Sequence, residues 1–298
     1  MSNEAIPLNT SIAGVAVARQ VLDAVVQYPV FEHIQQAAVA DINLMSEIRM
    51  PFGLMVLADP GMGKTLLLEV IRRSLTQMDH FLDKARPVLS ISLDSAVDTH
   101  KLASKLMFAL GYPMLPSRPN LESMTHMIDM GIDRLKPKVL LVDECQHMCE
   151  GNRDITARAL TDWLKVRMDK HNLPFAGAGT TTFERISEIN PQFTSRSSAK
   201  YTIGPFQIGD AWSQLIQAFA SVVTKVDLKA LKSDSMLKAT HLATGGNLRR
   251  LKKLLVYACI SAADRPQAML TKEDMESGFD RAFGLASGLA NPFRSKRS

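Results

Sequence analysis

Apolar and polar positions along this chain predict an α/β core followed by an all-helical region. Short continuous apolar runs are typical of strands buried on both faces, and apolar residues recurring with a helical period are typical of amphipathic helices. The predicted strands are 53–58, 87–93, 138–142, 174–179 and 200–203, and the helices around them are 13–27, 31–49, 66–78, 99–110, 120–135 and 155–170. Strands that alternate with helices favour a parallel five-stranded sheet between two helical layers, a three-layer αβα fold.

The strand pattern stops near residue 208, and the rest of the chain has helical spacing only. This region predicts four helices, at 209–225, 228–243, 247–263 and 272–285. We therefore expect an N-terminal helical segment at 1–48, the α/β core at 49–206, a small helical lid domain at 207–286 and a basic flexible tail at 287–298.

The turn after the first predicted strand has the pattern of a phosphate-binding loop. Residues 58–65 read Ala-Asp-Pro-Gly-Met-Gly-Lys-Thr and stand between an apolar strand and a helix. In such a turn, backbone N–H groups and the positive helix end bind phosphate, the lysine reaches the outer phosphates and the hydroxyl is a ligand of Mg²⁺. We predict a bound nucleoside triphosphate. The predicted binding residues are Asp59, Pro60, Gly61, Met62, Gly63, Lys64, Thr65 and Leu66.

One position of this loop departs from the pattern. The chain has Ala58 where the pattern has glycine, and a methyl group there restricts the turn geometry that glycine makes easy. The alternative to a phosphate loop is a chance Gly-Lys-Thr, which the strand before it and the helix after it argue against.

Two carboxylates follow the third predicted strand. Four apolar residues lead into Asp143 and Glu144, so both acids stand at the carboxyl end of a buried strand, the edge where open α/β sheets bind ligands. Asp143 fits as the Mg²⁺ partner of Thr65, and Glu144 fits as the general base that polarises an attacking water. Local capping or pairing is the alternative for two acids at a strand end.

Other polar residues complete the candidate site. Thr180 follows the fourth predicted strand and either orients the water or caps a helix. Arg196 precedes the fifth strand and is the candidate for stabilising transition-state charge in a neighbouring subunit, with Arg185 as its rival and a solvated surface side chain as the alternative. Arg249, in Gly-Gly-Asn-Leu-Arg-Arg of the helical region, is the candidate that reaches the phosphates from the lid.

Composition limits the function only loosely. The 298 residues carry a net charge of +5, which permits a polyanionic partner without requiring one. No apolar run is long enough to span a membrane, and the acidic start does not resemble a signal peptide. Three cysteines suggest a reducing compartment. The pair Cys145 and Cys149 around His147 fits no common zinc spacing, so a metal site there is disfavoured.

These motifs, taken in order, resemble an AAA+ ATPase and, more narrowly, the TniB/TnsC family of transposition regulators, with relatives in the MuB and IstB proteins. The resemblance covers roughly 30–265. It is carried by Arg49 to Val56, the phosphate loop, Ala109-Leu110-Gly111-Tyr112-Pro113, Leu141 to His147, Gly177-Ala178-Gly179-Thr180 and Gln192 to Arg196.

The resemblance implies ATP and Mg²⁺ as cofactors and slow hydrolysis stimulated by DNA or a partner. It implies that ATP-bound copies form rings or filaments on double-stranded DNA, with ATP at subunit interfaces, link a target-selection protein to a transposase, and leave on hydrolysis. It implies a cytoplasmic, nucleoid-associated bacterial protein with no membrane partner. The DNA-facing elements would follow the second strand, where the chain has Lys101, Lys105 and Arg118. Such contacts would be insensitive to sequence and sensitive to salt.

Other functions remain open at this level. An AAA+ helicase or clamp loader shares the same motifs. A small-molecule kinase with a phosphate loop belongs to a different class, and the helical domain argues against it. A nucleotide-binding switch with negligible turnover is the last alternative. Glu144 argues against it, because a candidate general base indicates hydrolysis.

Overall fold

The computed structural model describes residues 11–26, 28–78, 88–94, 97–113, 120–150, 154–284 and 290–294. The chain divides into two compact units. One is Val30–Gly204, and the other combines Met1–Pro29 with Pro205–Ser298. We call them the α/β unit and the helical unit and describe each by itself.

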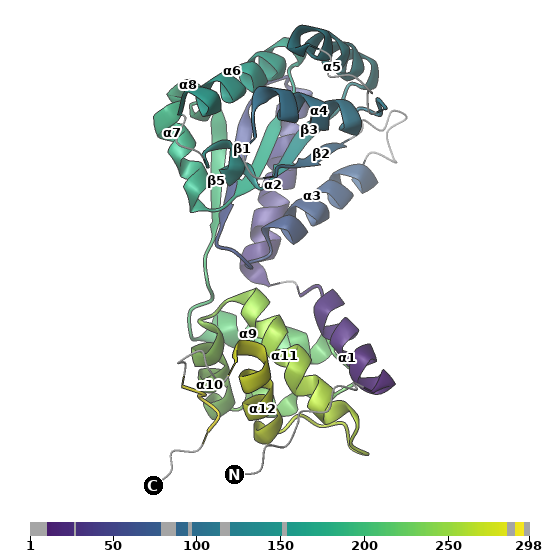
Figure 1. Ribbon diagram of the computed structural model, residues 1–298, viewed down its shortest axis with the longest axis vertical. Coiled ribbons are helices and arrows are strands. Elements are labelled where there is room, and N and C mark those ends of the chain that lie inside the picture. Colours follow the sequence, from purple (N-terminus) through teal and green to yellow (C-terminus); the bar gives the residue numbers. More distant parts are fainter. Residues whose placement is uncertain are drawn as a thin grey trace. The chain divides into compact units, whose positions relative to one another are not determined.

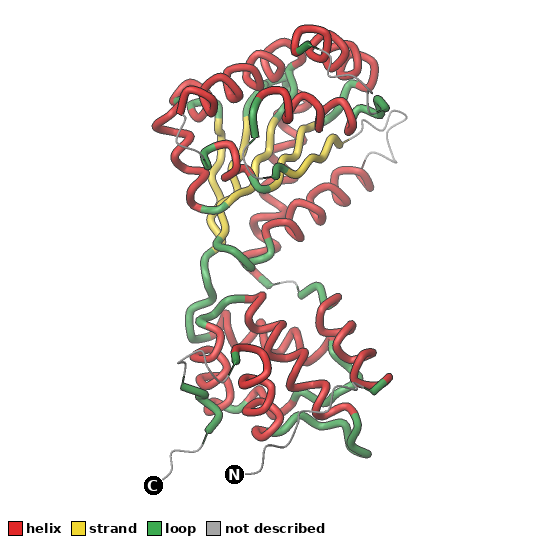
Figure 2. Tube along the Cα trace, in the orientation of Figure 1, coloured by secondary structure: helices red, strands yellow, loops and turns green. Residues whose placement is uncertain are grey.

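The α/β unit contains one sheet of five strands, all paired in parallel in the order β2-β3-β4-β1-β5 (Figures 1 and 2). The strands are β1 (Gly53–Ala58), β2 (Val88–Ser92), β3 (Val139–Asp143), β4 (Phe175–Gly179) and β5 (Ser197–Ile203). Every residue of β1, β3 and β4 is buried, which explains their apolar runs; the one charged residue among them is Asp143, the last residue of β3. The predicted α/β fold with a parallel five-stranded sheet is confirmed.

Helices cover both faces of this sheet (Figure 1). On one face, α4 (Thr99–Ala109), α5 (Leu121–Leu135), α6 (Asp154–His171) and the short α7 (Ile186–Ile189) and α8 (Pro191–Thr194) share a hydrophobic core with alternate strand residues such as Met55 and Leu57. On the other face lies α3 (Lys64–Met78), joined to α2 (Pro29–Glu47) by a hydrogen bond between Gln35 and Ser74. This arrangement gives the predicted αβα layers.

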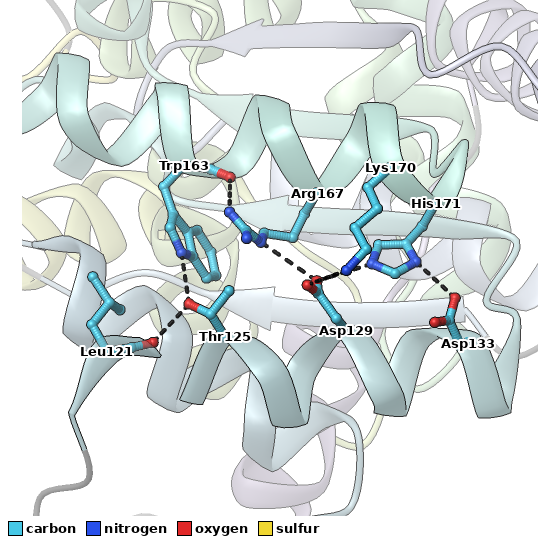
Figure 3. A network of polar contacts seen from close by, with 8 residues as sticks. All are labelled: Leu121, Thr125, Asp129, Asp133, Trp163, Arg167, Lys170 and His171. Atoms are coloured by element: carbon cyan, nitrogen blue, oxygen red, sulfur yellow. Dashed lines mark hydrogen bonds and ion pairs between the residues drawn. The ribbon is translucent and has the colours of Figure 1, made fainter. Parts of the chain in front are cut away.

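A network of charged groups joins α5 to α6 (Figure 3). The buried carboxylate of Asp129 accepts hydrogen bonds from Lys170 (2.8 Å) and from Nε2 of His171 (2.9 Å), and the guanidinium of Arg167 lies 3.5 Å away. The other ring nitrogen of His171 lies 2.9 Å from Asp133. A buried carboxylate is tolerated when cations and hydrogen bonds compensate it, so this network fixes how the two helices pack.

The helical unit contains α1 (Ile12–Asp23), α9 (Asp210–Val222), α10 (Asp234–Thr244), α11 (Leu248–Ala263), α12 (Lys272–Phe283) and a short 3₁₀ turn at Lys229–Lys232. Apolar residues of α11, among them Leu251, Leu254 and Ala258, are fully buried where α1 and α12 pack against it. The ammonium of Lys252 donates to the carbonyls of Leu22 and Ala24 at the end of α1. Lys252 therefore caps a helix instead of standing on a solvated face.

Several predicted boundaries were wrong. The segment 1–48 is not one piece, because α1 belongs to the helical unit and α2 to the α/β unit. The predicted helix 228–243 is broken at Ser233, where the backbone is extended and the side chain bonds to the carbonyl of Ala230.

The predicted flexible tail at 287–298 is wrong for residues 290–294, and its other residues lie outside the described ones. Residues 290–294 dock on α12, and Phe293 is fully buried beside Phe279. The amide of Asn291 bonds to Asp280, and Arg294 forms ion pairs with Asp280 and Glu276. An aromatic anchor with paired charges on its flank orders this part of the tail.

Candidate nucleotide-binding site

The phosphate loop connects β1 to α3 at the carboxyl edge of the sheet. Gly61 (φ +85°) and Gly63 (φ +89°) have left-handed backbones, which glycine adopts without steric cost. The N–H of Met62 bonds to the carbonyl of Asp59 and closes the turn. Ala58 is the last, fully buried residue of β1 and its φ is not positive. The methyl group of Ala58 is therefore compatible with the loop, although the motif has glycine at this position.

Four of the predicted catalytic and metal-binding side chains meet at this loop. The Thr65 hydroxyl donates to Oδ2 of Asp143 at 2.6 Å, and the ammonium of Lys64 lies 3.0 Å from Oε1 of Glu144. The other oxygen of Asp143 accepts the backbone N–H of Glu144 at 2.8 Å. A hydroxyl and a carboxylate side by side are oxygen ligands of the kind that Mg²⁺ prefers, so these residues fit the implied metal.

Glu144 is held in an unusual conformation with a left-handed backbone (φ +58°). Burial opposes its ionisation, but hydrogen bonds from Gln146 and Lys64 outweigh burial and lower the pKa of the carboxyl below its ordinary 4.5. The group is therefore ionised at neutral pH, the state that a general base requires.

Sequence reasoning missed Gln146, whose side chain contacts both Glu144 and Thr180. It lies in the 3₁₀ turn Cys145–Met148, and its amide binds both Glu144 and the backbone N–H of Thr180. Thr180 precedes the turn Thr181–Arg185, yet its side chain makes no capping hydrogen bond. The helix-cap alternative for the Thr180 side chain is thus not realised. The only sequence signal for Gln146 is a polar residue just after the paired acids.

Arg196 lies at the opposite edge of the sheet from the phosphate loop. It immediately precedes β5, whose Ser197 pairs with Gly53 at the start of β1, whereas Ile203 pairs with Ala58 beside the loop. The seven residues of β5 separate the two edges by about 20 Å. The guanidinium of Arg196 forms an ion pair with Asp169 near the end of α6. Arg196 therefore does not reach the phosphate loop of its own chain.

The comparisons with known proteins agree with this geometry. The family model described as bacterial TniB protein matches residues 17–202. The chain belongs to the TniB family.

Solved structures with a similar fold align with about nine-tenths of this TniB-family chain. They include the Aeropyrum pernix ORC2 protein in ADPNP–ADP complexes (TM-score 0.69, 14% identity, 91% of this chain and 72% of that one). Also similar are the Aeropyrum pernix ORC1 protein in complex with DNA (0.66, 15%, 89% and 69%) and Drosophila ORC bound to DNA (0.62, 15%, 93% and 68%). At these identities the likeness concerns the fold, which is that of AAA+ ATPases. A search of curated proteins gave no match.

The remaining predicted residues of this TniB-family chain have other surroundings. Arg185 bonds to the carbonyl of Cys149 and pairs with Asp154. Arg249 is exposed in the first turn of α11 and belongs to the helical unit. The Gly-Gly-Asn before it has a structural role, because Asn247 caps α11 by accepting the N–H of Arg250 at 3.1 Å.

The three predicted DNA contacts are placed unequally. Lys101 is exposed in the first turn of α4. Lys105 forms an ion pair with Asp94 at 2.8 Å. Arg118 lies outside the described residues.

The three cysteines are free and buried, and burial raises the pKa of Cys149 to about 11. Among the described residues, no group of three or more His, Cys, Asp or Glu side chains is placed to hold a metal ion. Within the same ranges, no helix is long and apolar enough to cross a bilayer.

Proposed function

We propose that this TniB-family chain is an ATP-dependent, DNA-binding regulator of DNA transposition. ATP-bound copies assemble on target duplex DNA, connect a target-selection protein to a transposase, and leave after hydrolysis. The observation that carries the proposal is the cluster of Lys64, Thr65, Asp143 and Glu144 at one sheet edge of a TniB-family chain. Two similar solved structures are named as complexes with DNA, which supports DNA as the ligand.

In the proposed reaction, each side chain of the cluster has a separate task. The ammonium of Lys64 leaves Glu144 and binds the outer phosphate oxygens of ATP instead. Thr65 and Asp143 would hold Mg²⁺, which would supply positive charge against the phosphates. Glu144 then accepts the proton of the attacking water. Loop N–H groups and the first turn of α3 orient the phosphates.

Assembly supplies the remaining group in this proposal. Arg196 stands about a strand length from its own phosphate loop, so it acts on the nucleotide of a neighbouring copy. That step requires Arg196 to give up Asp169. Thr180 orients the water. Hydrolysis is thereby coupled to contact between copies.

Electron microscopy with duplex DNA tests the assembly. The protein is imaged with and without a slowly hydrolysed ATP analogue, as the unaltered chain, as Lys64→Ala and as Lys229→Ala, a control at an exposed lysine of the helical unit. We expect nucleotide-dependent rings or filaments from the unaltered and control proteins and none from Lys64→Ala. Normal assemblies from Lys64→Ala, or no assemblies from the unaltered chain, would refute the proposal.

An AAA+ helicase or clamp loader shares this site, and a small-molecule kinase shares its phosphate loop. A helicase separates the strands of a labelled duplex when ATP is hydrolysed, whereas the proposed regulator leaves the duplex closed. A kinase transfers the phosphoryl group to a small molecule, whereas the proposed reaction releases inorganic phosphate. Both measurements use the same protein preparation and distinguish the proposed regulator from a helicase and from a kinase.

A further inference from the structure

The side-chain amide of Gln146 joins two parts of the site that are far apart in sequence. Gln146 is 5% exposed. Its Nε2 donates a hydrogen bond to Oε2 of Glu144, and its Oε1 accepts the backbone N–H of Thr180 at 3.1 Å. A carboxylate only accepts and a backbone N–H only donates, so these two partners fix which way the amide points.

Strand β4 leaves room for this contact because its last residues are small. A Cβ on Gly179 would lie 3.0 Å from the backbone nitrogen of Gln146 and 3.1 Å from its Oε1. A Cβ on Gly177 would lie 3.0 Å from the sulfur of Cys145 and 2.7 Å from the ring of Phe175. These separations are shorter than ordinary packing distances. The Gly-Ala-Gly sequence therefore lets the turn of Gln146 lie directly against the end of β4, just before Thr180.

The two carboxylate oxygens of Glu144 have different partners. Oε1 faces the ammonium of Lys64 at 3.0 Å, and Oε2 accepts from Gln146. When Lys64 moves to phosphate, Oε1 loses its partner and becomes available to water. Oε2 keeps its hydrogen bond to Gln146, because that residue does not depend on the nucleotide for its position.

We propose that Gln146 is a positioning residue for ATP hydrolysis, which holds Glu144 by one oxygen and ties it to the end of β4 at Thr180. The inference rests on the proposed ATPase function. Gln146 orients the base and the backbone of Thr180 together, so the attacking water meets both in one fixed arrangement. It takes no part in holding the phosphates, so its loss acts on turnover and leaves ATP affinity unchanged.

Steady-state ATP hydrolysis with duplex DNA measures this role. Gln146→Met keeps a similar side-chain length and removes both hydrogen bonds. We expect kcat to fall about tenfold or more, since a general base contributes roughly 10²–10⁴-fold and a misaligned base keeps part of that. We expect KM for ATP, and the affinity for a slowly hydrolysed analogue, to stay within about twofold of the values for the unaltered protein, because Gln146 does not contribute to ATP binding.

The matched control is Gln217→Met, since Gln217 is an exposed residue of α9 that bonds only weakly to Ser213 (3.3 Å). If Gln146→Met does not fold, Gln146→Glu replaces it. Gln146→Glu keeps an acceptor for the N–H of Thr180 but places a second carboxylate against Glu144, and the same loss of kcat is expected.

Two results separate this inference from the proposed function. A kcat at or above that of the unaltered protein, or a rise in KM that accounts for the whole loss of kcat/KM, overturns the role of Gln146 while Glu144→Gln remains inactive. An unaltered protein that hydrolyses no ATP, or Glu144→Gln with full turnover, refutes the proposed function itself and the role of Gln146 with it.

Discussion

Replacing Gly246 by alanine tests how the helical unit is built, with the neighbouring Gly245 as a matched control. Both have left-handed backbones, with φ of +70° and +61°. A Cβ on Gly245 would meet nothing within 4 Å, whereas one on Gly246 would lie 2.0 Å from the carbonyl oxygen of Phe206. Non-bonded atoms do not approach so closely, so alanine at 246 must displace the backbone.

The expected destabilisation follows from these contacts. Gly245→Ala carries only the left-handed strain and lowers the free energy of unfolding by about 1–2 kcal/mol. Gly246→Ala adds overpacking of about 1–3 kcal/mol and the loss of about 1 kcal/mol from the hydrogen bond that the N–H of Phe206 donates to the carbonyl of Gly246 (3.0 Å). Its total is about 3–6 kcal/mol.

The two tryptophans of the chain make the measurement specific. Trp163 lies in the α/β unit and Trp212 in the helical unit, where its buried ring is 6.2 Å from that of Phe206. In a Trp163→Phe background, urea unfolding followed by fluorescence reports on the helical unit alone. Equal losses of stability in Gly245→Ala and Gly246→Ala would refute the reasoning, because only the close approach to Phe206 distinguishes the two positions.

Three further substitutions test the site and the fold. Glu144→Gln should bind ATP and assemble on DNA but lose about 10²-fold or more in turnover, measured by phosphate release, and full turnover would place the base elsewhere. Arg196→Ala should bind a fluorescent ATP analogue normally and lose DNA-stimulated hydrolysis about 10³-fold, whereas an unchanged rate would favour another arginine. Burial opposes ionisation of Asp129, but hydrogen bonds from Lys170 and His171 outweigh it and lower its pKa below 3.8. Because the pKa of Asp129 is lower in the folded state, the stability it contributes is present above about pH 4 and is lost as pH falls through the folded-state pKa. Asp129→Asn should therefore unfold at lower denaturant concentration at pH 7, and its stability should depend less on acid pH in denaturant titrations. An unchanged acid dependence would argue against this role of Asp129.

The sheet and its phosphate loop were predictable because local sequence determines them. Strands buried on both faces have nearly continuous apolar runs, and β1, β3 and β4 show them, with Asp143 at the end of β3 as the charged exception. The loop needs Gly61 and Gly63 for its left-handed turns, so its glycines mark it directly. The helical pattern of α3 then gave the third part of the motif.

Features set by distant contacts were not predictable. The backbone of Asp227 pairs with the chain around Met269, a contact between segments far apart in sequence that no local pattern marks. Phe293 is an isolated aromatic residue in a polar tail, and only the docking on α12 shows that it is buried. Gln146 is similar, since its role depends on the glycines of β4 some thirty residues later.

On the proposed function, the position of Arg196 makes hydrolysis depend on a second copy. An arginine side chain is far shorter than β5, so this group cannot contribute to hydrolysis in its own chain. In a single chain its charge is compensated by Asp169, and leaving that partner requires a stronger anion, such as the phosphates held by a neighbour. On the proposed function, a lone chain then binds ATP without efficient turnover, and hydrolysis begins only after copies have assembled. Such an order suits a regulator, because the assembly on DNA exists before the reaction that dissolves it.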